Sequence, residues 1–204
     1  MRLTEHFLKR ERPEPFFWLN EPERAQFGDG LEIHTDLRTD FWQRTHYGFR
    51  RDDGHALLLR LSEDFTLTSH VHFQPQVQYD QCGLMVRIDP ENWIKASTEY
   101  EDEAHSRLGS VVTNLGYSDW ATQDVLSSHT EMWYRLSRCG SDFLIEASFN
   151  GQHWFQLRVA HLHKAGESVE AGVYACSPIG RNFKCRFTEV TIAENTWSYA
   201  GDTA

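Results

Sequence analysis

The sequence predicts an all-β protein in which two packed antiparallel sheets form a β-sandwich or barrel. Residues 65–73 alternate almost perfectly, with Phe65, Leu67 and Phe73 on one face and polar side chains on the other. This period of two is typical of a strand with one buried face. Turn residues recur between such segments, and helix signals are weak. About ten or more short strands separated by turns favour this architecture.

The same alternation, bounded by turn residues, recurs along the chain. In chain order, the expected strands cover residues 31–35, 55–61, 65–73, 79–89, 93–101, 107–114, 132–137, 143–149, 154–159, 169–176 and 184–192. Asn150 and Gly151 favour the left-handed backbone angles of a tight hairpin turn between two of them. Phe143 and Phe149 alternate as core residues in the strand before this turn. Each sheet would bury one face of its strands against the other sheet.

Residues 1–30 read as an arm that precedes a single β-sandwich domain at 31–204. Pro13, Pro15 and Pro22 favour extended backbone in this arm. The arm also carries Phe16 and Trp18, whose large rings would be costly to leave in water. We therefore expect the arm to pack onto the domain.

Composition excludes several classes of protein. The chain has 204 residues, a formal net charge of −10 and 13% aromatic residues, and it is too apolar for a disordered protein. Its acidic balance argues against nucleic-acid binding. The chain shows neither the apolar core of a signal peptide nor a run of about 20 apolar residues that could span a membrane. A cytoplasmic location is expected, with the four cysteines as free thiols and no structural zinc site.

The expected strand pair at residues 79–101 carries the most informative polar pattern. Trp93, Lys95 and Glu99 share one face of the second strand, while the other face is apolar. If a turn joins the strands, Gln81 and Arg87 could lie beside these residues. Such a surface suits a sugar, because polar groups can bond its hydroxyls while the indole supports its ring. The alternative is a solvated outer face with cross-strand ion pairs.

Aromatic and charged residues also meet in two expected loops. The first contains Trp42 and Arg44, and the second contains Asp119 and Trp120. Loops on a rigid sandwich are common places for ligand contacts. The alternative is that the two tryptophans cover the edges of the core. Arg135 lies on a separate expected strand and shares a face with Glu131 and Trp133, so it is a further candidate for ligand binding.

Catalysis and metal binding find weaker support. Glu99 and Glu101 share a strand face, and glycoside hydrolysis uses a pair of carboxylates, so Glu99 is the catalytic candidate if the protein is an enzyme. His70 and His72 share another face, as His161 and His163 would if extended. The sequence names no clear third ligand, so exposed histidines are the favoured interpretation and no metal or cofactor is expected.

An ordered set of segments across the chain resembles a known family. The segments are Thr39-Asp40-Phe41-Trp42 with Tyr47-Gly48-Phe49, residues 79–86 with Trp93-Ile94-Lys95, residues 109–114 with Ser118-Asp119-Trp120, residues 132–136, and residues 172–178. They resemble the regulation-of-enolase-protein-like family, a domain of unknown function found in bacteria and fungi. The resemblance extends from about Trp18 to Phe187.

The resemblance implies a concanavalin A-like jelly-roll β-sandwich, from the superfamily of lectins and glucanases. The Glu-x-Asp-x-x-Glu signature of the glucanase relatives is absent, which disfavours an enzyme. A fold alone does not supply a function. The favoured hypothesis is a saccharide- or small-molecule-binding protein that contacts neither nucleic acid nor membrane. Its expected ligand-binding residues are Trp42, Arg44, Gln81, Trp93, Lys95, Glu99, Asp119, Trp120 and Arg135.

Two further hypotheses stay open. One is a carbohydrate-active enzyme, similar to a glycoside hydrolase, that uses Glu99. The other is a regulatory module that is linked to central carbon metabolism and that contacts another protein or forms a homodimer. Aromatic residues of the arm could form either interface.

Overall fold

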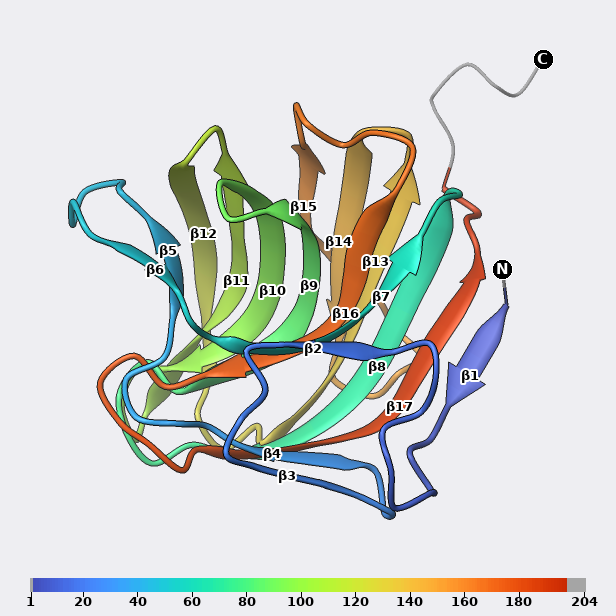
Figure 1. Ribbon diagram of the computed structural model, residues 1–204. Helices are drawn as coiled ribbons and strands as arrows, with labels where there is room; N and C mark the ends of the chain where they lie inside the picture. The colour runs from blue at the N-terminus through green and yellow to red at the C-terminus, as the bar shows by residue number, and fades with distance from the viewer. Residues whose placement is uncertain (1, 198–204) are drawn as a thin grey trace.

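The computed structural model describes residues 2–197, and these residues contain no helix. Two large antiparallel sheets pack face to face (Figure 1). We call the eight-stranded sheet A and the seven-stranded one sheet B. A hairpin of two short strands stands apart from both, beside the edge of sheet B. The predicted jelly-roll β-sandwich is confirmed.

The strands of each sheet come from distant parts of the chain. Sheet A has the order β15 (Phe155–His161), β14 (Asp142–Ser148), β13 (Glu131–Cys139), β8 (Phe65–Gln74), β17 (Lys184–Glu194), β4 (Leu31–His34) and β3 (Arg24–Phe27), and β1 (Leu3–Glu5) also pairs with β17. Sheet B has the order β12 (Tyr117–Leu126), β11 (His105–Asn114), β10 (Asn92–Tyr100), β9 (Gln81–Asp89), β16 (Val169–Cys176), β7 (His55–Leu61) and β2 (Phe17–Leu19). The hairpin joins β5 (Phe41–Gln43) to β6 (Arg50–Asp52).

The main core lies between the two sheets and follows the period-two pattern. On β10, Ile94 and Ala96 point into this core with no exposed surface. Thr98 continues the same face, and its hydroxyl lies 2.6 Å from the Tyr134 hydroxyl of sheet A. That hydrogen bond satisfies two polar groups that would otherwise be buried alone. The alternate residues of β10 therefore point to the outer face of sheet B.

Three local predictions are wrong. Residues 117–120 belong to strand β12 and not to a loop, because this edge strand is polar on both faces and shows no alternation. Phe149 lies beyond the end of β14, is 41% exposed, and stacks on Phe155 instead of filling the core. The turn at Asn150 does join β14 to β15, but it spans residues 149–154. The Asn150 side chain accepts hydrogen bonds from two backbone amides there and stabilises this wider turn.

The first 30 residues are part of both sheets. β1 and β3 extend sheet A, and β2 pairs with β7 at the edge of sheet B. Phe7 and Phe16 are almost fully buried, and their ring centroids lie 5.9 Å apart. The segment is thus integral to the sandwich. At the other end, residues 198–204 of the expected domain lie outside the described residues.

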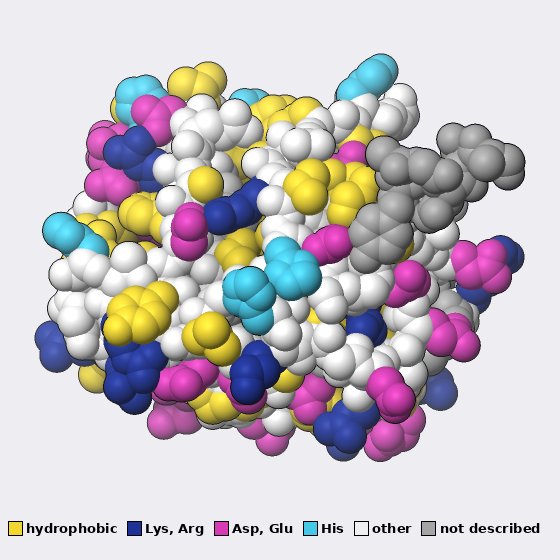
Figure 2. All heavy atoms as spheres, turned by 90° about the horizontal axis from the view of Figure 1, so that it is seen from above, with side chains coloured by type: hydrophobic (Ala, Val, Ile, Leu, Met, Phe, Trp, Pro, Cys, Tyr) yellow, Lys and Arg dark blue, Asp and Glu magenta, His cyan; other side chains and the backbone are white. Residues whose placement is uncertain are grey.

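The last features of the fold concern its cysteine thiols and its surface charges. All four cysteines are free and buried, and burial raises the pKa of the Cys82 and Cys176 thiols well above the ordinary value. No helix among residues 2–197 is long and apolar enough to cross a membrane. Figure 2 shows acidic and basic side chains interspersed over one face. The negative net charge is therefore not gathered into a single patch on that face.

Candidate functional site

The outer face of sheet B carries a cavity of about 780 Å³ beneath the β5–β6 hairpin. Its walls come from the hairpin, from β9 to β12 and from the loop after β16. The lining residues are Asp40, Trp42, Tyr47, Phe49, Arg51, Tyr79, Gln81, Lys95, Glu99, Glu101, Arg107, Val111, Trp120, Thr122, Pro178 and Ile179. This volume lies within the range of ordinary small-molecule sites, roughly 300–1,000 Å³.

A second hydrophobic cluster holds the hairpin against the sheet. Phe41 from β5 makes edge contacts with Trp93 and Tyr174, each at 6.2 Å between ring centroids. Met85 and Val111 from the outer face of sheet B complete this cluster beside Phe41. Sheet B is therefore buried on both faces over part of its area. The cavity begins where this cluster ends.

Glycine and three polar anchors fix the position of the hairpin. A Cβ atom at Gly54 would lie 2.3 Å from the Phe41 ring, so only glycine lets the ring lie flat there. Asp52 forms a bidentate ion pair with Arg87 of β9, with N–O distances of 2.7 and 2.8 Å. The backbone amide of Gln43 donates to the Ser118 hydroxyl of β12 at 2.9 Å.

Arg44 supplies the third anchor. Its guanidinium donates to the Gly116 carbonyl at 2.6 Å and to the Glu91 carboxylate at 2.7 Å. Both partners lie in turns at the end of sheet B, away from the cavity. Arg44 itself has a φ of 55°, so the backbone turns sharply at the point where the side chain reaches the sheet. The residue positions the hairpin and does not line the cavity.

Strand register explains why the floor of the cavity is hollow. Lys95, Val111 and Trp120 lie side by side on three neighbouring strands. Two residues further along, Ser97 lies opposite Gly83 on one side and Gly109 on the other. The centre of this row, from Gly83 to Gly109, has almost no side-chain volume, and Thr122 of β12 borders it. The next row begins with Glu99, so large polar groups stand on both sides of a shallow trough.

Lys95 is a buried cation held by the hairpin. Its ammonium donates to the Phe41 carbonyl at 2.9 Å and lies 3.6 Å from the Asp40 carboxylate. The same nitrogen lies 5.8 Å from the ring centroids of both Trp93 and Tyr174. A hydrogen bond, an opposite charge and two aromatic faces together compensate for the loss of water around the ammonium.

Glu99 is a carboxyl group whose proton affinity is tuned by the cavity. Burial raises its pKa to about 7, and the negative charges of Asp40 and Glu101 add to this effect against the opposing influence of Lys95. The Gln81 amide donates a hydrogen bond to the Glu99 carboxylate, and the Tyr174 hydroxyl donates to Gln81 at 3.1 Å. Near neutral pH, Glu99 therefore exchanges between a hydrogen-bond donor and an anionic acceptor.

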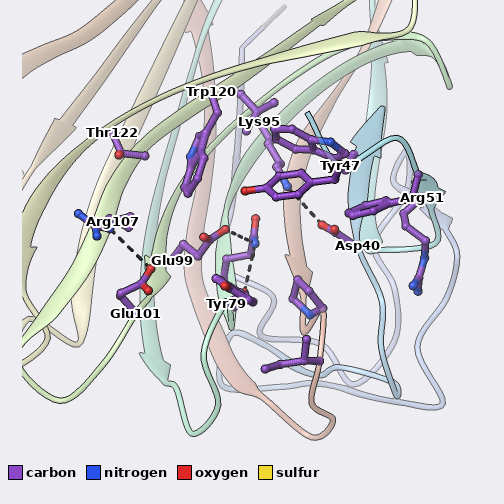
Figure 3. A pocket seen from close by; sticks show the side chains of 16 residues that line it. Asp40, Tyr47, Arg51, Tyr79, Lys95, Glu99, Glu101, Arg107, Trp120 and Thr122 are labelled. Atoms are coloured by element: carbon purple, nitrogen blue, oxygen red, sulfur yellow. Dashed lines mark hydrogen bonds and ion pairs between the residues drawn. The ribbon is translucent and has the colours of Figure 1, made fainter. Parts of the chain in front are cut away.

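The rim of the cavity is aromatic and exposed. Figure 3 shows Trp120 of β12 and Tyr47 of the β5–β6 loop pointing into the cavity from opposite sides. Tyr47 is 55% exposed and Trp120 is 40% exposed. The Trp42 ring lies behind Tyr47 at 5.4 Å between centroids and donates to the Thr45 carbonyl at 3.0 Å. Apolar rims around a few polar groups are typical of ligand sites.

The structure brings together five of the nine residues proposed for ligand binding. Trp42, Gln81, Lys95, Glu99 and Trp120 all line the cavity. The predicted contact of Gln81 with Glu99 is present, in direct strand register. The other four lie elsewhere, for a different physical reason in each case.

Arg44 anchors the hairpin, as described above. Trp93 lies on the predicted face but is completely buried under Phe41, and its indole donates to the Pro90 carbonyl at 3.1 Å. Asp119 points to the opposite face of β12 from Trp120 and forms an ion pair with Arg158 at 2.9 Å.

Arg135 lies on a different sheet. It forms an ion pair with Glu146 at 2.7 Å on the outer face of sheet A, with its guanidinium 4.2 Å from the Trp154 ring centroid. Parity correctly gave it an outward direction. Strand parity does not say which of the two sheets a residue belongs to.

Several cavity residues are absent from the predicted ligand-binding set. Glu101 was named only as a carboxylate that shares a face with Glu99. Tyr79, which precedes β9, shares the parity of Gln81, and Arg107 of β11 lies in register with Glu99, so the signal was present. Glu101 accepts a hydrogen bond from Gln78 at 2.6 Å and lies 3.6 Å from the Arg107 guanidinium. No comparable signal marks Phe49 and Ile179, because both come from irregular segments that only the fold brings to the rim.

Comparisons with known proteins agree on the fold. The chain is 36% identical over 173 residues to Regulation of enolase protein 1 of Saccharomyces cerevisiae, covering 84% of this chain and 86% of that protein. It also resembles the crystal structure of a functionally unknown protein from Saccharomyces cerevisiae, with a TM-score of 0.83, 33% identity and coverage of 89% and 97%.

A more distant likeness links the sandwich to part of a larger protein. The GH43 protein BlXynB of Bacillus licheniformis matches with a TM-score of 0.74 at 14% identity, covering 93% of this chain but only 39% of that protein. This likeness concerns the fold alone. Residues 18–195, by contrast, match the family described as "Protein of unknown function (DUF1349)", and the chain belongs to that family.

Proposed function

We propose that the cavity under the β5–β6 hairpin binds a saccharide or a sugar derivative. The observation that carries this proposal is the pairing of exposed rings at the rim, Tyr47 and Trp120, with the polar groups of Gln81, Lys95 and Glu99 on the floor. A sugar presents hydroxyls at its edges and C–H groups on its faces. The C–H groups carry partial positive charge and suit the negative face of an aromatic ring.

The floor offers both kinds of hydrogen-bonding group that a hydroxyl can use. The Lys95 ammonium donates, the side-chain carbonyl of Gln81 accepts, and Glu99 with a pKa of about 7 donates or accepts according to its protonation. Two neighbouring hydroxyls of one sugar ring could thus bond to adjacent groups on the floor while the ring lies against Trp120. The rings at the rim are already in place, which reduces the entropy cost of binding.

Calorimetry with a panel of mono- and oligosaccharides tests this proposal. We expect saturable binding by the wild type, and a loss of affinity of roughly tenfold or more in Trp120→Ala. Trp154→Ala is the matched control, because Trp154 lies on the outer face of sheet A beside Arg135. An absence of binding to every sugar, or equal binding by wild type and Trp120→Ala, would overturn the proposal.

A second candidate function is hydrolysis of a glycoside, and the raised pKa of Glu99 favours it. A carboxyl with a pKa of about 7 is suited to general acid catalysis near neutral pH. Glu101 and Asp40 are further carboxylates of the same cavity. Screening on chromogenic glycosides with Glu99→Gln as the comparison decides the point. Equal turnover by both proteins would reject Glu99 as the catalyst.

A further inference from the structure

The outer face of sheet A, opposite the cavity, carries a trio of metal-ligating side chains. His70 and His72 lie two residues apart on β8, and Glu131 lies directly opposite His72 on β13. One ligand atom from each of the three side chains lies within 4.8 Å of the others. Within residues 2–197 this trio is the only such group of three or more His, Cys, Asp or Glu side chains. The third ligand, which the sequence did not identify, is Glu131, and the pairing of β13 with β8 places it beside the two histidines.

The spacing of the atoms fits a zinc ion. The Glu131 Oε2 atom lies 3.2 Å from Nδ1 of His72 and 3.6 Å from Nε2 of His70. Zinc binds nitrogen and oxygen at about 2.0–2.2 Å with tetrahedral angles, which separates neighbouring ligand atoms by roughly 3.4 Å. These two distances lie on either side of that value. The three ligand atoms lie within 4.8 Å of one another, so side-chain rotations would have to bring the two imidazole nitrogens to a similar separation.

The Nε2 atom of His70 is buried and has no hydrogen-bond partner in the part of the chain that the structure describes. Buried polar atoms without partners are rare and call for an explanation such as an unseen ion. Nδ1, the other ring nitrogen of His70, lies 2.9 Å from the Thr188 hydroxyl. In the tautomer that donates to Thr188, Nε2 presents its lone pair to the trio, the usual arrangement of a metal-bound histidine.

The surroundings hold the trio in place and leave one side open. The His70 ring stacks on Trp133 with centroids 3.7 Å apart and planes within 4°. Glu189 of β17 lies in register with His70 and adds a second negative charge. The side chains of His72 and Glu131 are 39% and 47% exposed, so an ion can enter from solvent.

We propose that His70, His72 and Glu131 form a binding site for a divalent d-block metal ion such as zinc. Two imidazoles and one carboxylate are a set of ligands that zinc accepts, whereas Ca²⁺ and Mg²⁺ require oxygen ligands. Three protein ligands leave a fourth position for water or for another ligand from solvent. The ion would join β8 to β13 in the middle of sheet A. This site is independent of the sugar proposal, since it lies on the other sheet.

Calorimetric titration of the metal-free full chain with zinc chloride tests the site. We expect one equivalent to bind, with affinity reduced at least about tenfold in both His72→Ala and Glu131→Gln. Both side chains are partly exposed, so we expect both variants to fold, and circular dichroism checks this. Titration with cobalt(II) gives a second readout, because four-coordinate Co²⁺ absorbs visible light far more strongly than the hydrated ion.

The chain contains its own matched control. His161 and His163 form the other pair of histidines two residues apart, with ring centroids separated by 5.0 Å, and among residues 2–197 the carboxylate paired with them is that of Asp142, at 2.6 Å from His161. The double variant His161→Ala/His163→Ala should bind zinc as the wild type does. Three results would each overturn the proposal: no saturable zinc binding by the wild type, unchanged binding in both His72→Ala and Glu131→Gln, or loss of binding in the control alone.

Discussion

The outer faces of the two sheets have similar residues but different environments. On sheet B, Lys95 and Trp93 are buried because the β5–β6 hairpin covers them. On sheet A, Arg135 and Trp154 make a comparable cation–ring contact at 4.2 Å, but within residues 2–197 no hairpin covers it and the Arg135 side chain remains 30% exposed. A covering hairpin thus converts an ordinary polar sheet face into a cavity with a buried cation and a carboxyl of raised pKa.

The comparison also separates two kinds of site. The cavity on sheet B depends on a long-range contact between residues 41–54 and strands β9 to β12. The trio on sheet A depends only on neighbouring strands and on side chains that stand on one face. Ligand affinity at the first site should therefore follow the stability of the hairpin, whereas metal affinity at the second should not.

The largest expected difference between the faces concerns their tryptophans. Trp93→Ala removes a fully buried ring from the cluster under the hairpin and should lower the free energy of unfolding by about 3–5 kcal/mol. Trp154→Ala removes a partly exposed ring and its contact with Arg135, and should cost about 1 kcal/mol. Urea denaturation measures both. Equal losses would contradict the view that the hairpin creates a second core.

Sequence pattern revealed the sandwich because alternation is a local property. Residues 65–73 and 94–98 show the buried parity directly, and the structure places them as expected. The hairpin and β12 escaped prediction for the opposite reason. β5 and β6 have three residues each, and β12 is exposed along most of its length, so neither carries a period-two signal.

The candidate site was predictable only in part. The parity of a residue in a strand gives the face to which its side chain points, but it does not show whether another segment packs over that face. Trp93 and Glu99 were both correctly placed on the outward face of β10. Which of them remains open to a ligand depends on where Phe41 packs, and that contact joins residues 52 positions apart. Arg135 shows the complementary limit, since an outward residue of sheet A has the same pattern as one of sheet B.

Glu99→Gln should change how stability depends on pH. The ordinary pKa of this carboxyl is 4.5, and burial raises it to about 7 in the folded protein. Between these values the folded protein keeps a proton that the unfolded chain has released, so the contribution of Glu99 to stability is full below about pH 4.5 and is lost as pH rises to about 7. Relative to wild type, Glu99→Gln should gain up to about 3 kcal/mol between pH 4.5 and pH 8.

Denaturation of both proteins across this pH range isolates the group, because every other titrating residue is shared. Glu146→Gln on sheet A is the comparison for an outer-face glutamate that is paired with an arginine. A constant difference between wild type and Glu99→Gln at all pH values would show that the cavity does not raise the pKa of Glu99.

The two cations form the next comparison. Lys95→Ala leaves the Phe41 carbonyl without its donor and the Asp40 carboxylate without its nearest cation, at a cost of about 1–3 kcal/mol. Arg135→Ala breaks a partly exposed ion pair with Glu146, at a cost of about 1 kcal/mol or less. Thermal and urea denaturation give both values. A larger loss for Arg135→Ala would reverse the assignment of the buried cation to sheet B.

Tyr47→Ala should have the smallest effect on stability and still sharpen the comparison. The ring is more than half exposed at the tip of the hairpin, so its removal should change the free energy of unfolding by no more than about 0.5 kcal/mol. If the rim binds a sugar face as proposed, the same substitution should weaken saccharide binding by roughly tenfold. Zinc binding on sheet A should not change, because the two sites lie on different sheets. The substitution would then lower saccharide affinity while leaving the free energy of unfolding nearly unchanged. This is the result expected for a hairpin whose base packs against sheet B and whose tip contacts the ligand.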